Sequence, residues 1–118
     1  MATNQSTTTP YCTIDEAIEI LRTGQPIVLK DEPEREDEGD LIVSAQLISA
    51  ETITLMLREA RGLLTVPIEQ ARLEALDIAL VPTRNTDERC PRFAVPVDAV
   101  CIHSTGISAS DRARTIRE

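Results

Sequence analysis

The chain has 118 residues, with 12 Lys and Arg against 20 Asp and Glu, and a formal net charge of −8. This length fits one domain, and 42% apolar residues are enough to fill a core and too many for a disordered acidic tail. The acidic balance argues against nucleic acid as a partner, and no apolar run reaches the roughly 20 residues that cross a membrane.

The chain opens with a polar, Thr- and Ser-rich segment, residues 1–12, which we expect to be a disordered arm. The remaining residues, 13–118, are expected to form one domain. Its first predicted element is a helix over residues 14–22, with apolar residues at helical spacing. Thr13 and Glu16 have the spacing of a capping box, which predicts where this helix begins.

The middle of the chain alternates between short apolar runs and helical patterns. The runs at residues 27–29 and 41–43 predict buried strands on either side of an acidic stretch. Ser49 then has the sequence context of an N-cap, and the apolar spacing after it predicts a second helix that ends at a glycine. A third strand is predicted over residues 63–66, followed by a helix over residues 68–76.

The last third of the chain begins with a predicted long loop, residues 80–92, rich in proline and charge. A strand, residues 93–98, and a final helix, residues 108–118, are expected after it. Ser108 should cap that helix, with Asp111 as its capping-box partner. Strands alternating with helices indicate the α/β class. Because the last helix has just begun where the sequence given ends, we expect a truncated domain.

The acidic stretch, residues 31–40, contains seven carboxylates and one Arg, a net charge of −6. If it is extended, four alternate carboxylates share a face and Arg35 turns to the other side. These four are Glu34, Glu36, Glu38 and Asp40. Like charges about 4 Å apart repel by about 1 kcal/mol in water, so a divalent cation, a shared proton or a cationic group would relieve the cluster. Oxygen ligands favour Mg²⁺ or Mn²⁺ here; the alternative is a solvated charge run.

Within this stretch, residues 35–40 read Arg-Glu-Asp-Glu-Gly-Asp, which closely resembles the Arg-Glu-Asn-Glu-Gly-Asp signature of the 3,4-dihydroxy-2-butanone-4-phosphate synthase family. Three further blocks are similar to family segments. They are the Arg-Gly-Leu run at residues 61–63, the Asn-Thr-Asp run at 85–87 and the Ser-Thr-Gly-Ile-Ser-Ala-Ser-Asp-Arg run at 104–112. The blocks occur in the family's order, so the chain is identified as the N-terminal part of a member's domain.

The resemblance implies a lyase of riboflavin biosynthesis that converts D-ribulose 5-phosphate into formate and 3,4-dihydroxy-2-butanone 4-phosphate. It also implies an α/β (α+β) three-layer sandwich around a mixed β-sheet. The expected cofactor is Mg²⁺ or Mn²⁺, the expected partner a sugar phosphate, and the expected assembly a cytoplasmic homodimer.

By the same resemblance, Glu36 is the metal ligand, and Glu36, Glu38 and Asp40 are the catalytic carboxylates. Arg35, Glu36, Asp40 and Thr105 are the implied substrate contacts. Enolisation and dehydration of a sugar phosphate move protons and develop charge on adjacent oxygens. Carboxylates can transfer these protons, and a metal ion can stabilise the charge.

His103 is the single histidine of the sequence, and it matches neither of the family's functional histidine motifs. It is therefore expected to be structural or exposed. Three cysteines in no metal-ligand spacing do not suggest a disulfide framework, which fits a cytosolic protein. The alternative function is that of a truncated, non-catalytic homologue that binds a divalent cation or another protein.

Overall fold

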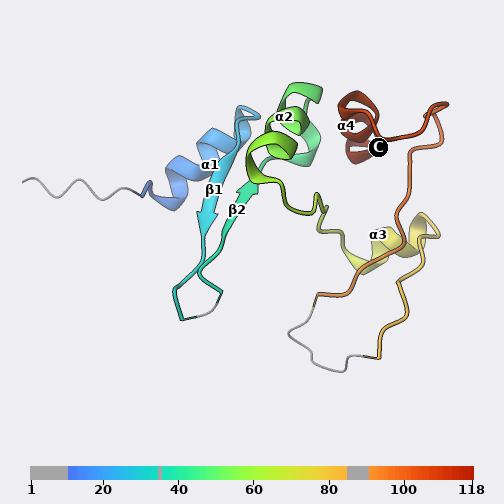
Figure 1. Ribbon diagram of the computed structural model, residues 1–118, viewed down its shortest axis with the longest axis horizontal. Coiled ribbons are helices and arrows are strands. Elements are labelled where there is room, and N and C mark those ends of the chain that lie inside the picture. The colour runs from blue at the N-terminus through green and yellow to red at the C-terminus, as the bar shows by residue number, and fades with distance from the viewer. Residues whose placement is uncertain (1–10, 35, 85–90) are drawn as a thin grey trace, which may run out of the picture. The chain divides into compact units, whose positions relative to one another are not determined.

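The structure is a computed structural model that describes residues 11–34, 36–84 and 91–118 (Figure 1). The expected arm and the Asn-Thr-Asp run thus lie largely outside the described residues. The chain divides into two compact units, Met1–Ile48 and Ser49–Glu118, and each has its own elements.

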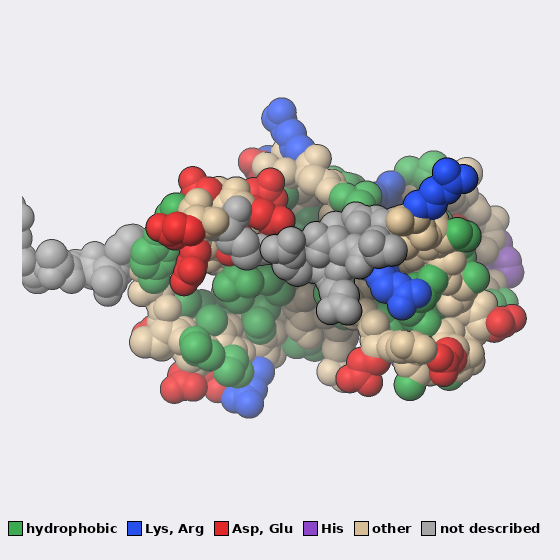
Figure 2. All heavy atoms as spheres, turned by 90° about the horizontal axis from the view of Figure 1, so that it is seen from below, with side chains coloured by type: hydrophobic (Ala, Val, Ile, Leu, Met, Phe, Trp, Pro, Cys, Tyr) green, Lys and Arg blue, Asp and Glu red, His purple; other side chains and the backbone are tan. Residues whose placement is uncertain are grey.

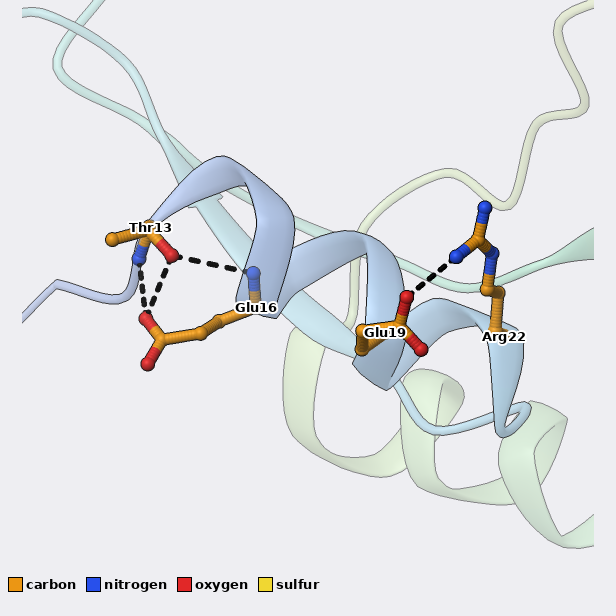
Figure 3. A network of polar contacts seen from close by, with 4 residues as sticks. All are labelled: Thr13, Glu16, Glu19 and Arg22. Atoms are coloured by element: carbon orange, nitrogen blue, oxygen red, sulfur yellow. Dashed lines mark hydrogen bonds and ion pairs between the residues drawn. The ribbon is translucent and has the colours of Figure 1, made fainter.

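The first unit begins with helix α1 (Ile14–Arg22), where the sequence predicts it. Figure 3 shows the capping box: the Thr13 hydroxyl accepts a hydrogen bond from the backbone N–H of Glu16 at 3.3 Å, and the Glu16 carboxylate accepts one from the backbone N–H of Thr13 at 2.8 Å. These bonds satisfy N–H groups that a helix start otherwise leaves unpaired. One turn later Glu19 and Arg22 form an exposed ion pair.

A β-hairpin follows, made of β1 (Ile27–Lys30) and β2 (Gly39–Ile42) in an antiparallel register that pairs Val28 with Leu41. Helix α1 packs beside β1. Both predicted strands form, although β2 begins two residues earlier than the apolar run and ends one residue before its end. As a result Asp40, expected in the loop, belongs to the ladder. The expectation that the strands are buried is wrong: Val28 is 70% exposed and Leu29 is 55% exposed, because two strands do not cover the faces of their own sheet. A short 3₁₀ turn, η1 (Ala45–Leu47), completes the described part of this unit.

The second unit starts with α2 (Ala50–Leu55), capped by the Ser49 hydroxyl as predicted. The helix continues into a wider π-type turn, η2 (Met56–Ala60). It ends at Arg61, which adopts a left-handed conformation with φ of 56°. The sequence predicts that this helix ends one residue later, at Gly62, because glycine is the residue that most often adopts the left-handed conformation at a helix end.

Two predicted strands are wrong. Residues 63–66 join no ladder within the described part of the chain, and Leu63 is 78% exposed. Residues 93–98 contribute a single bridge, between Ala94 and Leu80. A strand is stable only when its backbone N–H and C=O groups meet a partner, which an apolar run by itself does not supply. Between these segments α3 (Gln70–Ala75) forms, shorter than predicted.

Helix α4 (Ala109–Arg117) ends the described chain and packs against α2. Ile53 of α2 and Ala113 of α4 are almost completely buried and make the core of this unit. The described residues thus form a mixed α/β structure with four α-helices and a two-stranded antiparallel sheet, which confirms the predicted class. Among these helices, none has the length and apolar character to cross a membrane.

Candidate functional site

The acidic loop joins β1 to β2 at the tip of the hairpin (Figure 1). It is not extended. The chain turns at Pro33 and Glu34, and Asp37 takes a left-handed conformation with φ of 51°. The strict alternation of side chains that the sequence analysis assumed therefore does not hold across residues 33–37, and the common face of four carboxylates has no basis in the loop geometry.

The carboxylate of Asp31 organises this turn. Its Oδ1 accepts a hydrogen bond from the backbone N–H of Glu32 at 2.8 Å, and its Oδ2 accepts one from the backbone N–H of Glu36 at 3.0 Å. Its own backbone N–H donates to the carbonyl of Glu38 at 3.0 Å. Asp31 thus fixes the backbone at Glu36. Sequence reasoning missed this role, although an Asp at the start of a turn is a known signal for side chain–backbone bonding.

A cation from the strand partly balances the loop. The ammonium of Lys30 lies 2.9 Å from Oδ1 of Asp37, and both side chains are about half exposed. The backbone N–H of Asp37 donates to the carbonyl of Glu32. An exposed pair of this kind adds little to stability, about 0–1 kcal/mol, but it holds the Asp37 side chain next to Lys30 of β1.

Of the predicted loop residues, Glu36, Glu38 and Asp40 are exposed. Arg35 lies outside the described residues, so its predicted contact remains a prediction. The oxygen donors of the loop suit a hard cation in kind. The loop does not bring enough of these donors together, however. Within the described part of the chain, His, Cys, Asp and Glu side chains form no group of three or more that could hold a metal ion. Glu36 could therefore be one ligand of a metal centre. Glu36 and its described neighbours do not form a complete metal centre by themselves.

The second predicted site, Thr105, lies in the other unit, in the turn before α4, and is exposed. The next residue, Gly106, is buried and has φ of 71°. A Cβ placed on Gly106 would lie 2.2 Å from Oδ1 of Asp98, far inside contact distance. A carboxylate therefore occupies the space where any other residue would carry its side chain. Glycine is favoured here by its conformation, and any other residue would also displace the Asp98 side chain.

Side chains also tie this turn to α4. The Ser108 hydroxyl accepts a hydrogen bond from the backbone N–H of Asp111 at 3.1 Å, which confirms the predicted cap. The carboxylate of Asp111 accepts a bond from the Ser104 hydroxyl at 2.5 Å. It makes no reciprocal bond to the backbone N–H of Ser108, so the predicted capping box does not form. The bond from Ser104, followed by that from Ser108, lowers the pKa of Asp111. Arg112 closes the arrangement by donating from Nε to the carbonyl of Ile107 at 2.8 Å.

The remaining candidates are simple to place. His103 is exposed, as expected. Cys12 and Cys101 are free thiols, and Cys90 lies outside the described residues.

Comparison with known proteins gives a consistent result. Residues 15–118 match the family model for 3,4-dihydroxy-2-butanone 4-phosphate synthase. A protein of that name from Agrobacterium fabrum is 42% identical over 104 residues, which are 88% of this chain and 49% of the relative. Another, from Pseudomonas aeruginosa, is 43% identical over 105 residues, 89% of this chain and 29% of the relative.

A solved structure agrees with these relatives. The crystal structure of a 3,4-dihydroxy-2-butanone 4-phosphate synthase in complex with two magnesium ions superposes with a TM-score of 0.82 at 37% identity. The match covers 91% of this chain and 50% of that one. The chain thus spans half or less of the length of these relatives.

Proposed function

Because the chain belongs to the 3,4-dihydroxy-2-butanone 4-phosphate synthase family, we propose that it provides part of a lyase that converts D-ribulose 5-phosphate into formate and 3,4-dihydroxy-2-butanone 4-phosphate in riboflavin biosynthesis. The observation that carries this proposal is the match of residues 15–118, which include the acidic loop and the turn before α4. Residues 13–118 then form the N-terminal portion of the synthase domain, preceded by an arm at residues 1–12.

In this proposal the acidic loop does the proton chemistry. Glu36 supplies one oxygen ligand to Mg²⁺ or Mn²⁺, and its position is supported by the bond from its backbone N–H to Asp31. Glu38 and Asp40 are exposed carboxylates that can accept and return protons as the sugar enolises and loses water. The backbone of Asp40 is paired with Leu29 in the β-ladder, so the position from which the Asp40 side chain extends is fixed.

Two further residues complete the proposed substrate contacts. Arg35 would pair with a substrate oxygen or balance the loop charge, since a guanidinium donates several hydrogen bonds at once. Thr105 would offer its hydroxyl from the turn in which Gly106 lies against the Asp98 carboxylate.

The finer architecture belongs to the same proposal. We place the hairpin in a three-layer sandwich with a mixed β-sheet, in a cytoplasmic homodimer. The support from this chain is the apolar character of both faces of the hairpin, since a sheet covered by one layer alternates apolar and polar residues.

The experiment is formate release from ribulose 5-phosphate with Mg²⁺, comparing the wild type with Glu36→Gln. We expect the substitution to reduce the rate by about 10²- to 10⁴-fold, the range of a lost acid–base or ligand group. Glu34→Gln is the matched control, because it removes the same charge from the same loop at a position with no assigned role. If both variants lose activity equally, bulk charge explains the effect and the role of Glu36 is wrong. If a folded wild type releases no formate, this chain does not turn over by itself.

A second candidate function is a non-catalytic module that binds a cation or a protein. The many exposed hydrophobic side chains favour protein binding. Mn²⁺ titration separates the two forms of this alternative: equal affinity for the wild type and Glu36→Gln would remove Glu36 as a ligand.

A further inference from the structure

Thr105 is an exposed residue that lies between two anchored neighbours in the turn before α4. On one side, the Ser104 hydroxyl donates a hydrogen bond to Oδ2 of Asp111 at 2.5 Å. On the other side, Gly106 is buried and has the left-handed φ of 71°. The backbone of Thr105 is therefore held at both ends, while the residue itself stays open to solvent.

The carboxylate of Asp111 differs from most others in this acidic protein. Figure 2 shows carboxylates spread over the visible surface, and most of the described Asp and Glu residues are exposed. Asp31 and Asp111 are the two exceptions among the described residues, since both are partly buried. The bond from Ser104, followed by that from Ser108, lowers the pKa of Asp111. The carboxylate thus stays ionised near neutral pH, and an ionised oxygen is a strong hydrogen-bond acceptor.

Helix capping does not account for the bond between Ser104 and Asp111. The cap uses the Ser108 hydroxyl and the backbone N–H of Asp111, and the Asp111 carboxylate makes no reciprocal bond to Ser108. The bond from Ser104 instead joins residues seven positions apart. It therefore attaches the turn to the helix at the residue next to Thr105.

The rest of the segment is attached to the same helix. The backbone N–H of Ala99 donates to the Thr115 hydroxyl at 3.2 Å, and Nε of Arg112 donates to the carbonyl of Ile107 at 2.8 Å. Helix α4 packs against α2, and its Ala113 is 1% exposed. The turn is thus connected to the buried core of this unit by side chains on both sides of Thr105.

We propose that Ser104 and Asp111 are positioning residues for Thr105. Their bond restricts where the Thr105 hydroxyl can lie before a substrate arrives, and neither residue touches the substrate. A preorganised hydroxyl binds more tightly than one on a loose turn, because the turn loses less freedom on binding. The inference rests on the proposed function, in which Thr105 contacts ribulose 5-phosphate.

The test is the affinity of the full chain for ribulose 5-phosphate, measured by NMR titration of the amides of residues 104–108. Thr105→Val should weaken binding by about fivefold, the contribution of one hydrogen bond. Ser104→Ala should weaken it by about two- to fivefold, and Asp111→Ala should do the same from the other end of the bond. Asp111→Ala keeps the backbone N–H that Ser108 caps, so the helix start remains.

Three comparisons separate positioning from a general loosening of the turn. In the Thr105→Val background, Ser104→Ala should cause no further loss, because Ser104 acts only through the Thr105 hydroxyl. Ser104→Thr keeps a hydroxyl and should retain the wild-type affinity. Ser108→Ala is the matched control, because it removes a nearby hydroxyl of the same kind and breaks the cap but leaves the bond from Ser104 in place. It should not change the affinity.

The possible failures can be told apart. If the wild type does not bind ribulose 5-phosphate, or if Thr105→Val binds it equally well, the contact of Thr105 in the proposed function is wrong, and the positioning role is wrong with it. If Thr105→Val weakens binding and Ser104→Ala does not, only the positioning role is wrong. Equal losses in Ser104→Ala and Ser108→Ala, or a further loss in the double variant, would also overturn the positioning role.

Discussion

The turn before α4 allows a quantitative test through Gly106→Ala. Alanine would have to adopt φ near 71°, and this left-handed conformation costs an L-residue about 1–2 kcal/mol. Its Cβ would also meet the carboxylate of Asp98, at 2.2 Å from Oδ1. Because Asp98 is exposed, its side chain can turn aside, at a cost of about 0.5–1 kcal/mol for leaving its preferred rotamer. The two costs sum to about 2 kcal/mol.

Amide hydrogen exchange in the first turn of α4 measures this change, because Ser108 and Asp111 attach that turn to the glycine segment. A change of about 2 kcal/mol corresponds to roughly 30-fold faster exchange. Asp98→Ala by itself should have little effect, since its carboxylate is exposed. In the double variant Gly106→Ala with Asp98→Ala, only the steric part should be recovered. Full rescue would show that the backbone conformation costs nothing, and an unchanged rate in Gly106→Ala would refute the whole argument.

Two further predictions concern polar groups at helix starts. The backbone bond to Thr13, followed by that from its hydroxyl, lowers the pKa of Glu16. Thr13→Ala removes only the hydroxyl, so it should reduce the helicity of α1 in circular dichroism and raise the pKa of Glu16 part of the way toward its ordinary value. Stability from a lowered carboxyl pKa is present above the ordinary glutamate pKa and is lost as the pH falls through the lowered one, so this acid-side loss should shrink in the variant. Ser104→Ala should likewise raise the pKa of Asp111, measured by NMR titration, whereas Ser110→Ala, a control in α4, should not.

Local signals explain which parts of the fold the sequence predicts correctly. The capping box at Thr13 and the cap at Ser108 involve residues within one helical turn, so their geometry is already determined by sequence spacing. The strands of the hairpin are also neighbours, joined by one loop. The left-handed conformation of Arg61 was not predicted, because a glycine stands one position later in the sequence. The wider π-type turn of η2 ends the helix one residue before that glycine.

The acidic loop shows how a correct composition can still give a wrong geometry. Charge and order identified residues 35–40 as the family signature, and the family is confirmed. The expected common face assumed an extended backbone, and that assumption failed because Asp31 bonds to the backbone of Glu36 and bends the loop. An alternation rule applies only inside a strand. The metal role of Glu36 therefore stays a prediction, which its matched variants can test.

The segment at residues 63–66 marks the limit of single-sequence reasoning. Its apolar, β-branched character resembles that of β1, yet β1 lies in a ladder and this segment does not. The difference is the partner: β1 meets β2 across one loop, whereas a strand at residues 63–66 has to pair with residues distant in sequence. The amides of Leu64 and Val66 should therefore exchange with deuterium faster than the hydrogen-bonded amides of β1. Equal protection of the two segments would show that residues 63–66 do have a ladder partner, and it would refute this account.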